Sequence, residues 1–187
     1  MGVNAREAIL AAAKREAQAR GYGGLNFRDL AREVGIKAAS IHYHFPSKAD
    51  LGAAVARRYW QDTAEALEKL AETAGGPMEG LRQYPETFRR ALGDSNRMCL
   101  SSFMAAEHGD LPDAVRAEVQ AFADVNVAWL SKLLSAAELV ASEECDARAR
   151  AIYAAVAGAQ LVARSRSNVS VYDALIASYR SVGLLPA

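Results

Sequence analysis

The chain has 187 residues, of which 51% are hydrophobic and 24% charged, and its 22 Lys and Arg residues balance 22 Asp and Glu residues. This length allows one long domain or a small domain joined to a larger one. No apolar run reaches the roughly 18 residues of a membrane span, and Arg6, Glu7 and Lys14 interrupt the stretch where a signal peptide would be apolar. Cys99 and Cys145 form no C-x-x-C pair and no disulfide framework, so we expect a cytoplasmic, reducing location.

The zero net charge hides an uneven distribution. Residues 1–60 contain ten Lys and Arg residues and five Asp and Glu residues, a net charge of +5, and the rest of the chain carries −5. Such asymmetry is typical of a chain with one end that faces nucleic acid and an acidic body. Ordinary surface variation can produce the same totals, so charge alone leaves DNA binding undecided.

The N-terminal elements are all predicted to be helical. A first helix extends from about Asn4 to Arg20 and ends at a turn rich in glycine, which begins with Gly21. Asn26 is a good N-cap for a second helix, and Gly35 ends that helix after two turns. A third short helix covers about residues 38–44. These three helices occupy the first 45 residues.

The remainder is also predicted to be helical, so the fold class is all-α with about nine helices. Ser47 and Asp50 resemble a capping box at the start of a long helix over about residues 48–74. Further helices are expected near residues 79–93, 96–108, 112–137, 144–165 and 170–182. No strand-like alternation or internal repeat is present in the sequence.

The spacing inside the second and third helices predicts a helix-turn-helix over Phe27–Phe45. Gly35 follows Ala31 by four residues, and Ile41 follows Gly35 by six. Two helices that cross steeply need a small contact residue, a turn residue that tolerates positive φ, and a branched aliphatic residue that locks the pair. A plain helical hairpin is the alternative. The outer face of the third helix carries the polar residues Lys37, Ser40, His42, Tyr43 and His44.

A resemblance to the TetR/AcrR family of transcriptional regulators covers roughly residues 5–55. It rests on the segments Gly21-Tyr22, Asn26-Phe27-Arg28-Asp29-Leu30-Ala31, Val34-Gly35-Ile36 and Ile41-His42-Tyr43-His44-Phe45-Pro46-Ser47-Lys48. The resemblance implies a helix-turn-helix DNA-binding domain at residues 1–47 and a helical ligand-binding and dimerisation domain at residues 48–187. It also implies a homodimer that binds a palindromic operator in double-stranded DNA.

If the protein docks on DNA as other helix-turn-helix proteins do, the third helix lies in the major groove, and the starts of the second and fourth helices contact phosphates. The expected DNA-binding residues are Asn26, Arg28, Lys37, Ala39, Ser40, His42, Tyr43, His44 and Lys48. The family often has Tyr at the position of His42 and Ser or Thr at that of Lys37. The predicted docking mode depends on the helix-turn-helix and not on these two side chains.

The body carries large apolar side chains that favour an apolar or aromatic small-molecule effector. The resemblance implies that several of them line a pocket, although ordinary core packing explains each one singly. The expected pocket residues are Trp60, Tyr84, Phe88, Met98, Cys99, Phe103, Met104, Phe122, Asn126 and Trp129. Cys99 also suggests an alternative function, a regulator that senses electrophiles or oxidants through this thiol, although an inert buried cysteine is the commoner case.

The last two predicted helices carry matching apolar stripes that favour dimerisation. The expected interface residues are Ile152, Tyr153, Val156, Gln160, Tyr172, Leu175 and Tyr179. Paired across a two-fold axis, these stripes build a four-helix interface. Packing inside a single subunit is the other possibility for the same residues.

The sequence favours a binding protein over an enzyme. It contains no nucleophile–base–acid set, phosphate loop or zinc-like Cys/His spacing, so we expect no catalytic residue, metal site or cofactor. The predicted function is a repressor that a small apolar or aromatic effector releases from its operator. A regulator without a ligand, or an activator, remains a second possibility.

Overall fold

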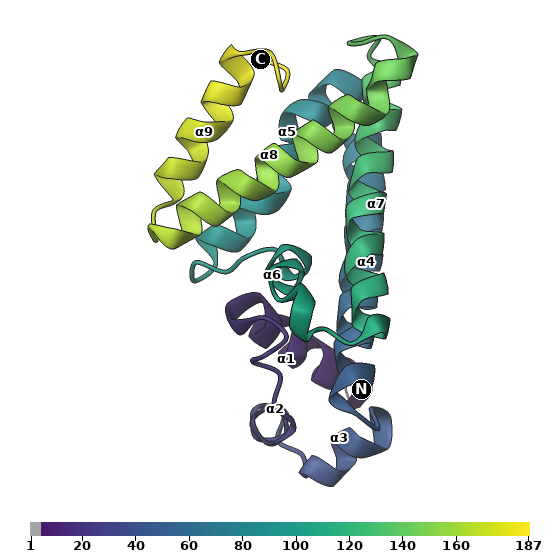
Figure 1. Ribbon diagram of the computed structural model, residues 1–187, viewed down its shortest axis with the longest axis vertical. Helices are drawn as coiled ribbons and strands as arrows, with labels where there is room; N and C mark the ends of the chain where they lie inside the picture. Colours follow the sequence, from purple (N-terminus) through teal and green to yellow (C-terminus); the bar gives the residue numbers. More distant parts are fainter. Residues whose placement is uncertain (1–4) are drawn as a thin grey trace. The chain divides into compact units, whose positions relative to one another are not determined.

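The computed structural model describes residues 5–187, and within that range all regular elements are helical (Figure 1), which confirms the all-α class. The α-helices are α1 (Ala5–Arg20), α2 (Phe27–Val34), α3 (Ala38–His44), α4 (Lys48–Thr73), α5 (Pro77–Gly93), α6 (Leu100–Ala106), α7 (Asp113–Ala136), α8 (Cys145–Ser165) and α9 (Val169–Ser181). Two 3-10 turns, η1 (His108–Asp110) and η2 (Ser142–Glu144), precede α7 and α8. The expected helix start at Asn4 lies outside the described residues. None of the described helices has the length and hydropathy that a membrane crossing requires.

The helix boundaries near the N-terminus follow from local capping. Asn26 caps α2, because its side-chain oxygen accepts hydrogen bonds from the backbone N–H groups of the second and third helical residues. Gly35 ends α2 with φ of 77°, and its N–H donates to Ala31 O at 3.0 Å. The Ser47 hydroxyl accepts from Asp50 N at 3.1 Å, and Asp50 Oδ2 accepts from Ser47 N at 3.0 Å. The predicted capping box is confirmed.

The helix expected over residues 96–108 is shorter than predicted. Its first residues form a turn in which Ser95 and Asn96 have φ of 59° and 54°. The Asn96 amide donates to Arg164 O at 3.1 Å and to Ser167 Oγ at 3.2 Å. These contacts to the end of α8 hold Asn96 outside a helical conformation, so α6 begins at Leu100.

Internal packing divides the chain into two compact units. The first comprises Met1–Gln61 and Leu100–Phe122, and the second comprises Asp62–Cys99 and Ala123–Ala187. These packing units differ from the domains expected at residues 1–47 and 48–187. That division remains a prediction about function.

The core of the first unit combines the N-terminal helices with α6 and the start of α7. Ile9 of α1, Leu30 of α2 and Ile41 of α3 are buried in the same cluster as Met104 of α6 and Val115 of α7. Figure 1 shows α6 beside α1, and the two helices are in contact. Because a short three-helix segment buries little apolar surface alone, these later helices supply part of its core.

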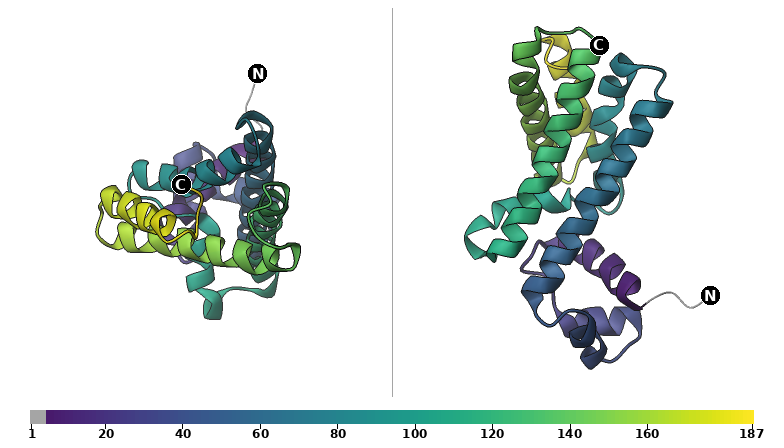
Figure 2. Two further views of the ribbon diagram at one scale, coloured as in Figure 1. Left: turned by 90° about the horizontal axis from the view of Figure 1, so that it is seen from above. Right: turned by 90° about the vertical axis from the view of Figure 1, so that its right-hand side faces the viewer.

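The second unit contains α5, α8 and α9 with the later parts of α4 and α7 (Figure 2). Gln160 is fully buried in α8, where its amide donates to Phe88 O at 2.6 Å and accepts from Cys99 N at 2.9 Å. The Tyr172 hydroxyl of α9 donates to Pro85 O at 2.7 Å. This hydroxyl and the Gln160 amide tie α9 and α8 to α5.

Replacement of Gly35 tests the turn between α2 and α3. Gly35→Ala should lower stability by about 1–2 kcal/mol, because an L side chain disfavours its left-handed backbone. For a chain of this size, this change lowers Tm by about 2–8 °C. No atom of the described residues lies within 4 Å of a Cβ placed at Gly35, so backbone conformation alone produces the loss.

Gly93→Ala is the matched control, because Gly93 is the last residue of α5 and also has open space where the new Cβ would lie. This variant should keep or raise Tm. Equal Tm values for Gly35→Ala and wild type would contradict the role given to the turn.

Candidate nucleic-acid interface

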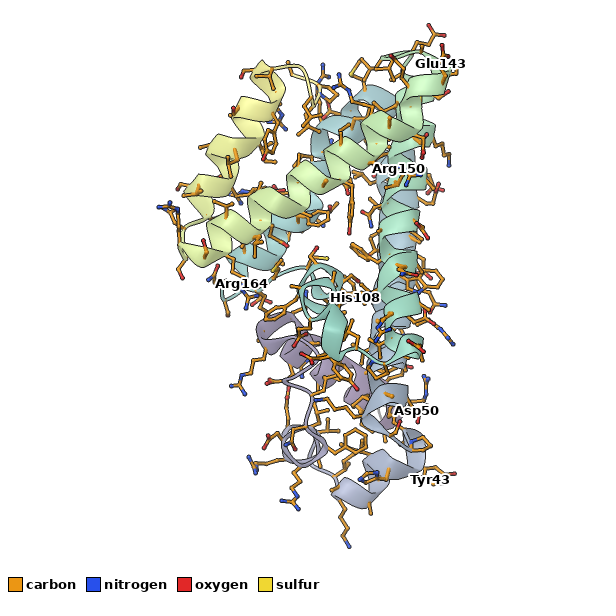
Figure 3. All side chains as sticks on the ribbon, in the orientation of Figure 1. Tyr43, Asp50, His108, Glu143, Arg150 and Arg164 are labelled. Carbon is orange, nitrogen blue, oxygen red and sulfur yellow. The ribbon has the colours of Figure 1, made fainter. Side chains whose placement is uncertain are left out.

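The outer face of α3 is exposed over the residues expected to contact DNA. Tyr43 is 84% exposed, and Figure 3 shows its side chain projecting away from the helix. Lys37, Ala39 and His42 are also exposed, while Ser40 and His44 are half-buried. A single exposed aromatic residue is common on protein surfaces, so the exposure of Tyr43 shows that its side chain is accessible to a partner.

The opposite face of α3 fixes the helix to the first unit. Ile41 is fully buried, and the following Phe45 is 2% exposed. The His42 ring packs on Phe27 of α2 with centroids 4.6 Å apart, and the Tyr43 ring meets His44 edge-on at 5.1 Å. These contacts limit the rotation of the two histidines and leave the Tyr43 hydroxyl at the tip of an ordered surface.

At the start of α2, the exposed Arg28 lies beside backbone N–H groups that Asn26 already caps. Asn26 Oδ1 accepts hydrogen bonds from Arg28 N at 2.8 Å and from Asp29 N at 3.3 Å. Two of the backbone donors expected to be open to a phosphate are therefore already paired. The exposed guanidinium of Arg28 has no acidic partner among residues 5–187 and is the remaining charged donor at this end.

Lys48 at the start of α4 is held in a defined position. Its Nζ donates to Gly23 O at 3.1 Å and lies 4.7 Å from the centroid of the Tyr22 ring. An ammonium group has three N–H donors, so the bond to Gly23 leaves others for a phosphate. Burial raises the pKa of the Tyr22 hydroxyl.

Glu107 holds the turn between α1 and α2, a role that the sequence did not predict. Its Oε2 accepts from Tyr22 N at 2.6 Å, and its Oε1 accepts from Gly23 N at 3.0 Å. The carboxylate fills the space beside Gly21, where φ is 71° and a Cβ would overlap it. No local sequence pattern predicts this contact, because 85 positions separate Glu107 from Tyr22.

Ion pairs neutralise much of the positive charge elsewhere in the first unit. Arg15 pairs with Glu33 at 2.5 Å, Arg58 with Glu7 at 2.7 Å, and Arg32 with Asp29 at 3.2 Å. Each of these pairs is solvent-exposed and adds little stability. Their effect is on charge distribution, since the cations that remain on the predicted surface are Arg28, Lys37 and Lys48.

The residues expected to line a pocket are divided between the two units. Trp60, Phe103, Met104 and Phe122 belong to the first unit, and Tyr84, Phe88, Met98, Cys99, Asn126 and Trp129 belong to the second. Met104 is part of the core described above. Phe122 stacks on Tyr59 at 5.3 Å, and Trp60 Nε1 donates to Glu118 Oε2 at 2.7 Å.

Glu118 is the acceptor for two partners in the first unit. Burial opposes its ionisation, but hydrogen bonds from Arg57 and Trp60, together with the charge of Arg57, hold its pKa below the usual value. Arg57 donates to Glu118 Oε1 through Nε at 2.9 Å and through Nη2 at 2.5 Å. Trp60 therefore has a fixed hydrogen-bond partner in this structure.

An aromatic cluster joins four of the larger side chains in the second unit. The Tyr84 ring stacks on Trp129 at 5.8 Å, contacts Phe88 edge-on at 5.8 Å, and Phe88 meets Tyr153 at 6.3 Å. The Tyr84 hydroxyl donates to Asn126 Oδ1 at 3.0 Å, and burial raises the pKa of Tyr84. The cluster is therefore a largely buried set of packed aromatic rings with neutral polar groups.

The expected dimer residues fall into two groups. Ile152, Val156, Gln160 and Tyr172 are at most 1% exposed, so packing within the chain already covers them and they offer no surface to a partner. Tyr153, Leu175 and Tyr179 are half-buried. The helical period predicted the apolar stripes, but the stripe on α8 turns inward at these positions because it packs on α5 and α9.

Neither cysteine is exposed, and no metal-binding cluster is present among the described residues. Cys99 is 2% exposed and Cys145 is 3% exposed. In residues 5–187, no group of three or more His, Cys, Asp and Glu side chains is placed to hold a metal ion. A solution reagent has no direct route to either thiol.

Comparisons with known proteins agree with this geometry. Residues 9–55 match the model of the bacterial regulatory proteins, tetR family. The chain is 24% identical to the HTH-type transcriptional repressor NemR of Escherichia coli K12, over 97% of this chain and 95% of NemR.

Two solved structures share the fold over nearly the whole chain. A TetR transcriptional regulator from Legionella pneumophila is 28% identical with a TM-score of 0.90, covering 97% of this chain and 99% of the other. A TetR-family regulator from Agrobacterium tumefaciens is 28% identical with a TM-score of 0.88, covering 95% and 96%. Residues 9–55 therefore carry the N-terminal domain of the tetR family of bacterial regulatory proteins, and the chain as a whole has the fold of solved TetR-family transcriptional regulators.

Proposed function

We propose that the protein is a cytoplasmic homodimeric repressor that binds a palindromic operator and leaves it when a small apolar or aromatic effector binds. One observation carries the DNA-binding part of this proposal. The exposed face of α3, with Tyr43 at its tip, is held rigidly by the buried Ile41 on the opposite face. A rigid helix that presents polar and aromatic groups fits the major groove of B-DNA.

The contacts on DNA follow from the position of each group. Ser40 and Tyr43 of α3 and Lys37, which directly precedes this helix, are the candidates for base edges or adjacent phosphates. Arg28 and Lys48 lie at the starts of α2 and α4, where they hold phosphates on either side of the groove. Tyr43 therefore contributes to recognition, and the two cations mainly set affinity and its dependence on salt.

Dimerisation is proposed through the exposed sides of α8 and α9. Leu161 is 53% exposed and Val162 is 42% exposed, and both lie on α8. The exposed positions of the two helices also include small residues: Ala151, Ala154, Gly158, Ala174 and Ala177. Small side chains allow close approach of helices across a two-fold axis, so these exposed positions replace the four buried ones in the proposed interface.

The second unit is the proposed location of the effector. Its aromatic cluster suits a flat apolar compound, and a ligand regulates DNA binding only if it prefers one conformation of the dimer. Release through oxidation or alkylation of Cys99 is the alternative, but the burial of this thiol favours the reversible effector. Operator affinity that changed after alkylation of Cys99 alone would favour the alternative.

The proposed DNA contacts of α3 are tested with DNA that the purified protein selects from a random library. The recovered sites should be palindromic, and Tyr43→Ala should weaken binding to them about tenfold or more, because one base contact contributes about 1–3 kcal/mol. Gel-shift titration measures the affinity. Leu139→Ala is the control, since Leu139 is also an exposed apolar residue but lies after α7. Equal affinities for Tyr43→Ala and the control would contradict the placement of α3.

Glu107→Gln tests whether the carboxylate that follows α6 positions Lys48 for DNA. The amide keeps one acceptor oxygen and loses the other, which frees part of the turn that holds Lys48 through Gly23. Operator affinity should fall about three- to tenfold, and the salt dependence of binding should flatten by up to about 0.9 in the log–log slope. A variant that is merely less stable keeps the wild-type slope.

Asp110→Asn is the matched control for Glu107→Gln. It removes the same charge three residues away in η1, and no ion pair of Asp110 occurs among the described residues. Its salt slope should equal that of wild type. If both variants shifted affinity and slope equally, net charge would explain the effect and the positioning role would be wrong.

Leu161→Glu tests the proposed dimer surface. A carboxylate at the centre of a close helix contact is desolvated without a partner, which costs several kcal/mol. Sedimentation equilibrium should therefore show monomers at concentrations where wild type is dimeric, and operator affinity should drop with the loss of the second half-site contact. Leu139→Glu, with the same change at a 39% exposed position, should stay dimeric. A Leu161→Glu dimer of wild-type strength would exclude this face.

A further inference from the structure

A cleft between α5 and α9 is lined by charged and apolar residues. Its volume is about 700 Å³, which is in the range of pockets that hold small molecules. Its described lining residues all belong to the second unit, and none of them is a ring of the aromatic cluster around Tyr84 and Trp129. The cleft is therefore a separate site from the one proposed for the effector.

The buried part of the lining is apolar. Tyr172 and Ile176 of α9 are 1% and 5% exposed, and Pro85 of α5 is also buried. The Tyr172 hydroxyl donates to Pro85 O, so the polar end of this ring is already occupied. We call these three residues the floor of the cleft. The floor offers a ligand apolar contact and no free hydrogen-bonding side chain.

Four arginines line the cleft, and two of them are bonded to carboxylates. Arg89 donates to Asp173 Oδ1 through Nε at 2.7 Å and to Oδ2 through Nη2 at 3.0 Å. Arg82 Nη1 donates to Glu79 Oε2 at 3.3 Å, and Arg82 Nε donates to Ala187 O. These two guanidinium groups therefore have oxygen partners within the chain.

The other two arginines, Arg90 and Arg180, form no ion pair with a residue in the range 5–187. Arg180 Nη2 donates to Arg82 O at 3.0 Å, which places its guanidinium beside α5. Glu79 is bonded to Arg82 and Gln83 and acts on Arg180 through charge alone. Because a guanidinium has five N–H donors, one backbone carbonyl leaves most of the binding capacity of Arg180 unused.

Arg180 and the floor lie on the same side of α9. Ile176 precedes Arg180 by four residues and Tyr172 precedes it by eight, which is the spacing of side chains on one helix face. All three line the cleft. An apolar surface therefore leads along α9 to a guanidinium that has no carboxylate partner.

Arg180 is a better anchor for an anion than Arg90. Arg90 is exposed, and Glu86 precedes it by four residues on α5, so these two exposed charges offset each other in part. Arg180 is half-buried and has lost part of its hydration. A bound carboxylate consequently stabilises Arg180 more than it stabilises a guanidinium that water already solvates.

We propose that the cleft between α5 and α9 binds an amphiphilic carboxylate, whose carboxylate contacts Arg180 and whose apolar body packs on the floor. The parallel N–H donors of a guanidinium match the two oxygens of a carboxylate. A small hydrophilic anion gains nothing from the floor, and a neutral ligand leaves Arg180 without an opposite charge. The inference goes beyond the proposed function, because neither DNA nor the aromatic cluster takes part in it.

Octanoate and octanamide test the inference, because they have the same apolar chain and only octanoate is charged. Each is titrated into the full chain, and the amide NMR signals of α9 give the dissociation constant. Octanoate should bind saturably in the millimolar range or more tightly. Octanamide should bind about tenfold more weakly, because a hydrogen bond between charged groups is stronger than one between neutral groups.

Two substitutions that remove the same charge locate the anchor. Arg180→Gln should weaken octanoate binding about tenfold and leave octanamide binding within about twofold of wild type. Arg90→Gln is the matched control in the same cleft, and it should leave octanoate binding within about twofold. Arg180→Lys keeps the charge and loses the paired donors, so it should weaken octanoate binding about threefold. Thermal unfolding shows whether each variant is folded.

Equal affinities for octanoate and octanamide would overturn the inference, because the floor alone would then account for binding. Equal losses in Arg180→Gln and Arg90→Gln would also overturn it, because general surface charge would explain them. The absence of saturable octanoate binding would do the same. If Arg180→Gln does not fold, wild-type octanoate affinity in Arg180→Lys overturns the inference. These measurements involve no DNA, so the proposed function stands or falls separately.

Discussion

The hydrogen bonds from Tyr22 N and Gly23 N to the Glu107 carboxylate tie the DNA-reading helices to a later part of the chain. They form only because Gly21 leaves the necessary space and adopts positive φ. The same turn supplies the carbonyl that holds Lys48. A single carboxylate that follows α6 thus organises the α1–α2 turn and the start of α4, and it makes the first unit depend on residues 100–122.

This dependence is the physical basis of the regulation proposed above. Met104 and Val115 belong to the same buried core as Ile41 of the recognition helix. A close-packed core passes displacement between its members because it has little free volume. A displacement of α6 would therefore be expected to alter the packing that supports α3. In the proposed function, an effector and an operator are coupled if they favour different positions of these helices.

Short-range capping and turn patterns in the sequence correctly predicted the boundaries of α2 and the start of α4. Asn26, Gly35 and the Ser47–Asp50 pair act through hydrogen bonds within a few residues, so the sequence shows both partners together. The exposed face of α3 followed from the helical period once Ile41 was placed inward. The Glu107 contact was not predictable in this way, because its partners lie more than 80 positions away.

The body was harder to predict because an apolar stripe does not reveal what covers it. Ile152 and Val156 satisfy the pattern of a dimer face but pack inside the chain, and exposed Leu161 lies on the adjacent side of the same helix. The large apolar residues grouped as one pocket also divide between the two packing units. Trp60 and Trp129 are alike in sequence terms, and only the structure distinguishes the paired indole from the unpaired one.

The central claim is that α3 reads the major groove in each half of a symmetric site. Methylation interference on a selected operator tests it most directly, because dimethyl sulfate modifies guanine N7 in the major groove. We expect two clusters of interfering guanines, related by two-fold symmetry and centred about one helical turn, or a multiple of it, apart. Binding that is insensitive to N7 methylation, but is displaced by a ligand of the minor groove, would contradict the claim.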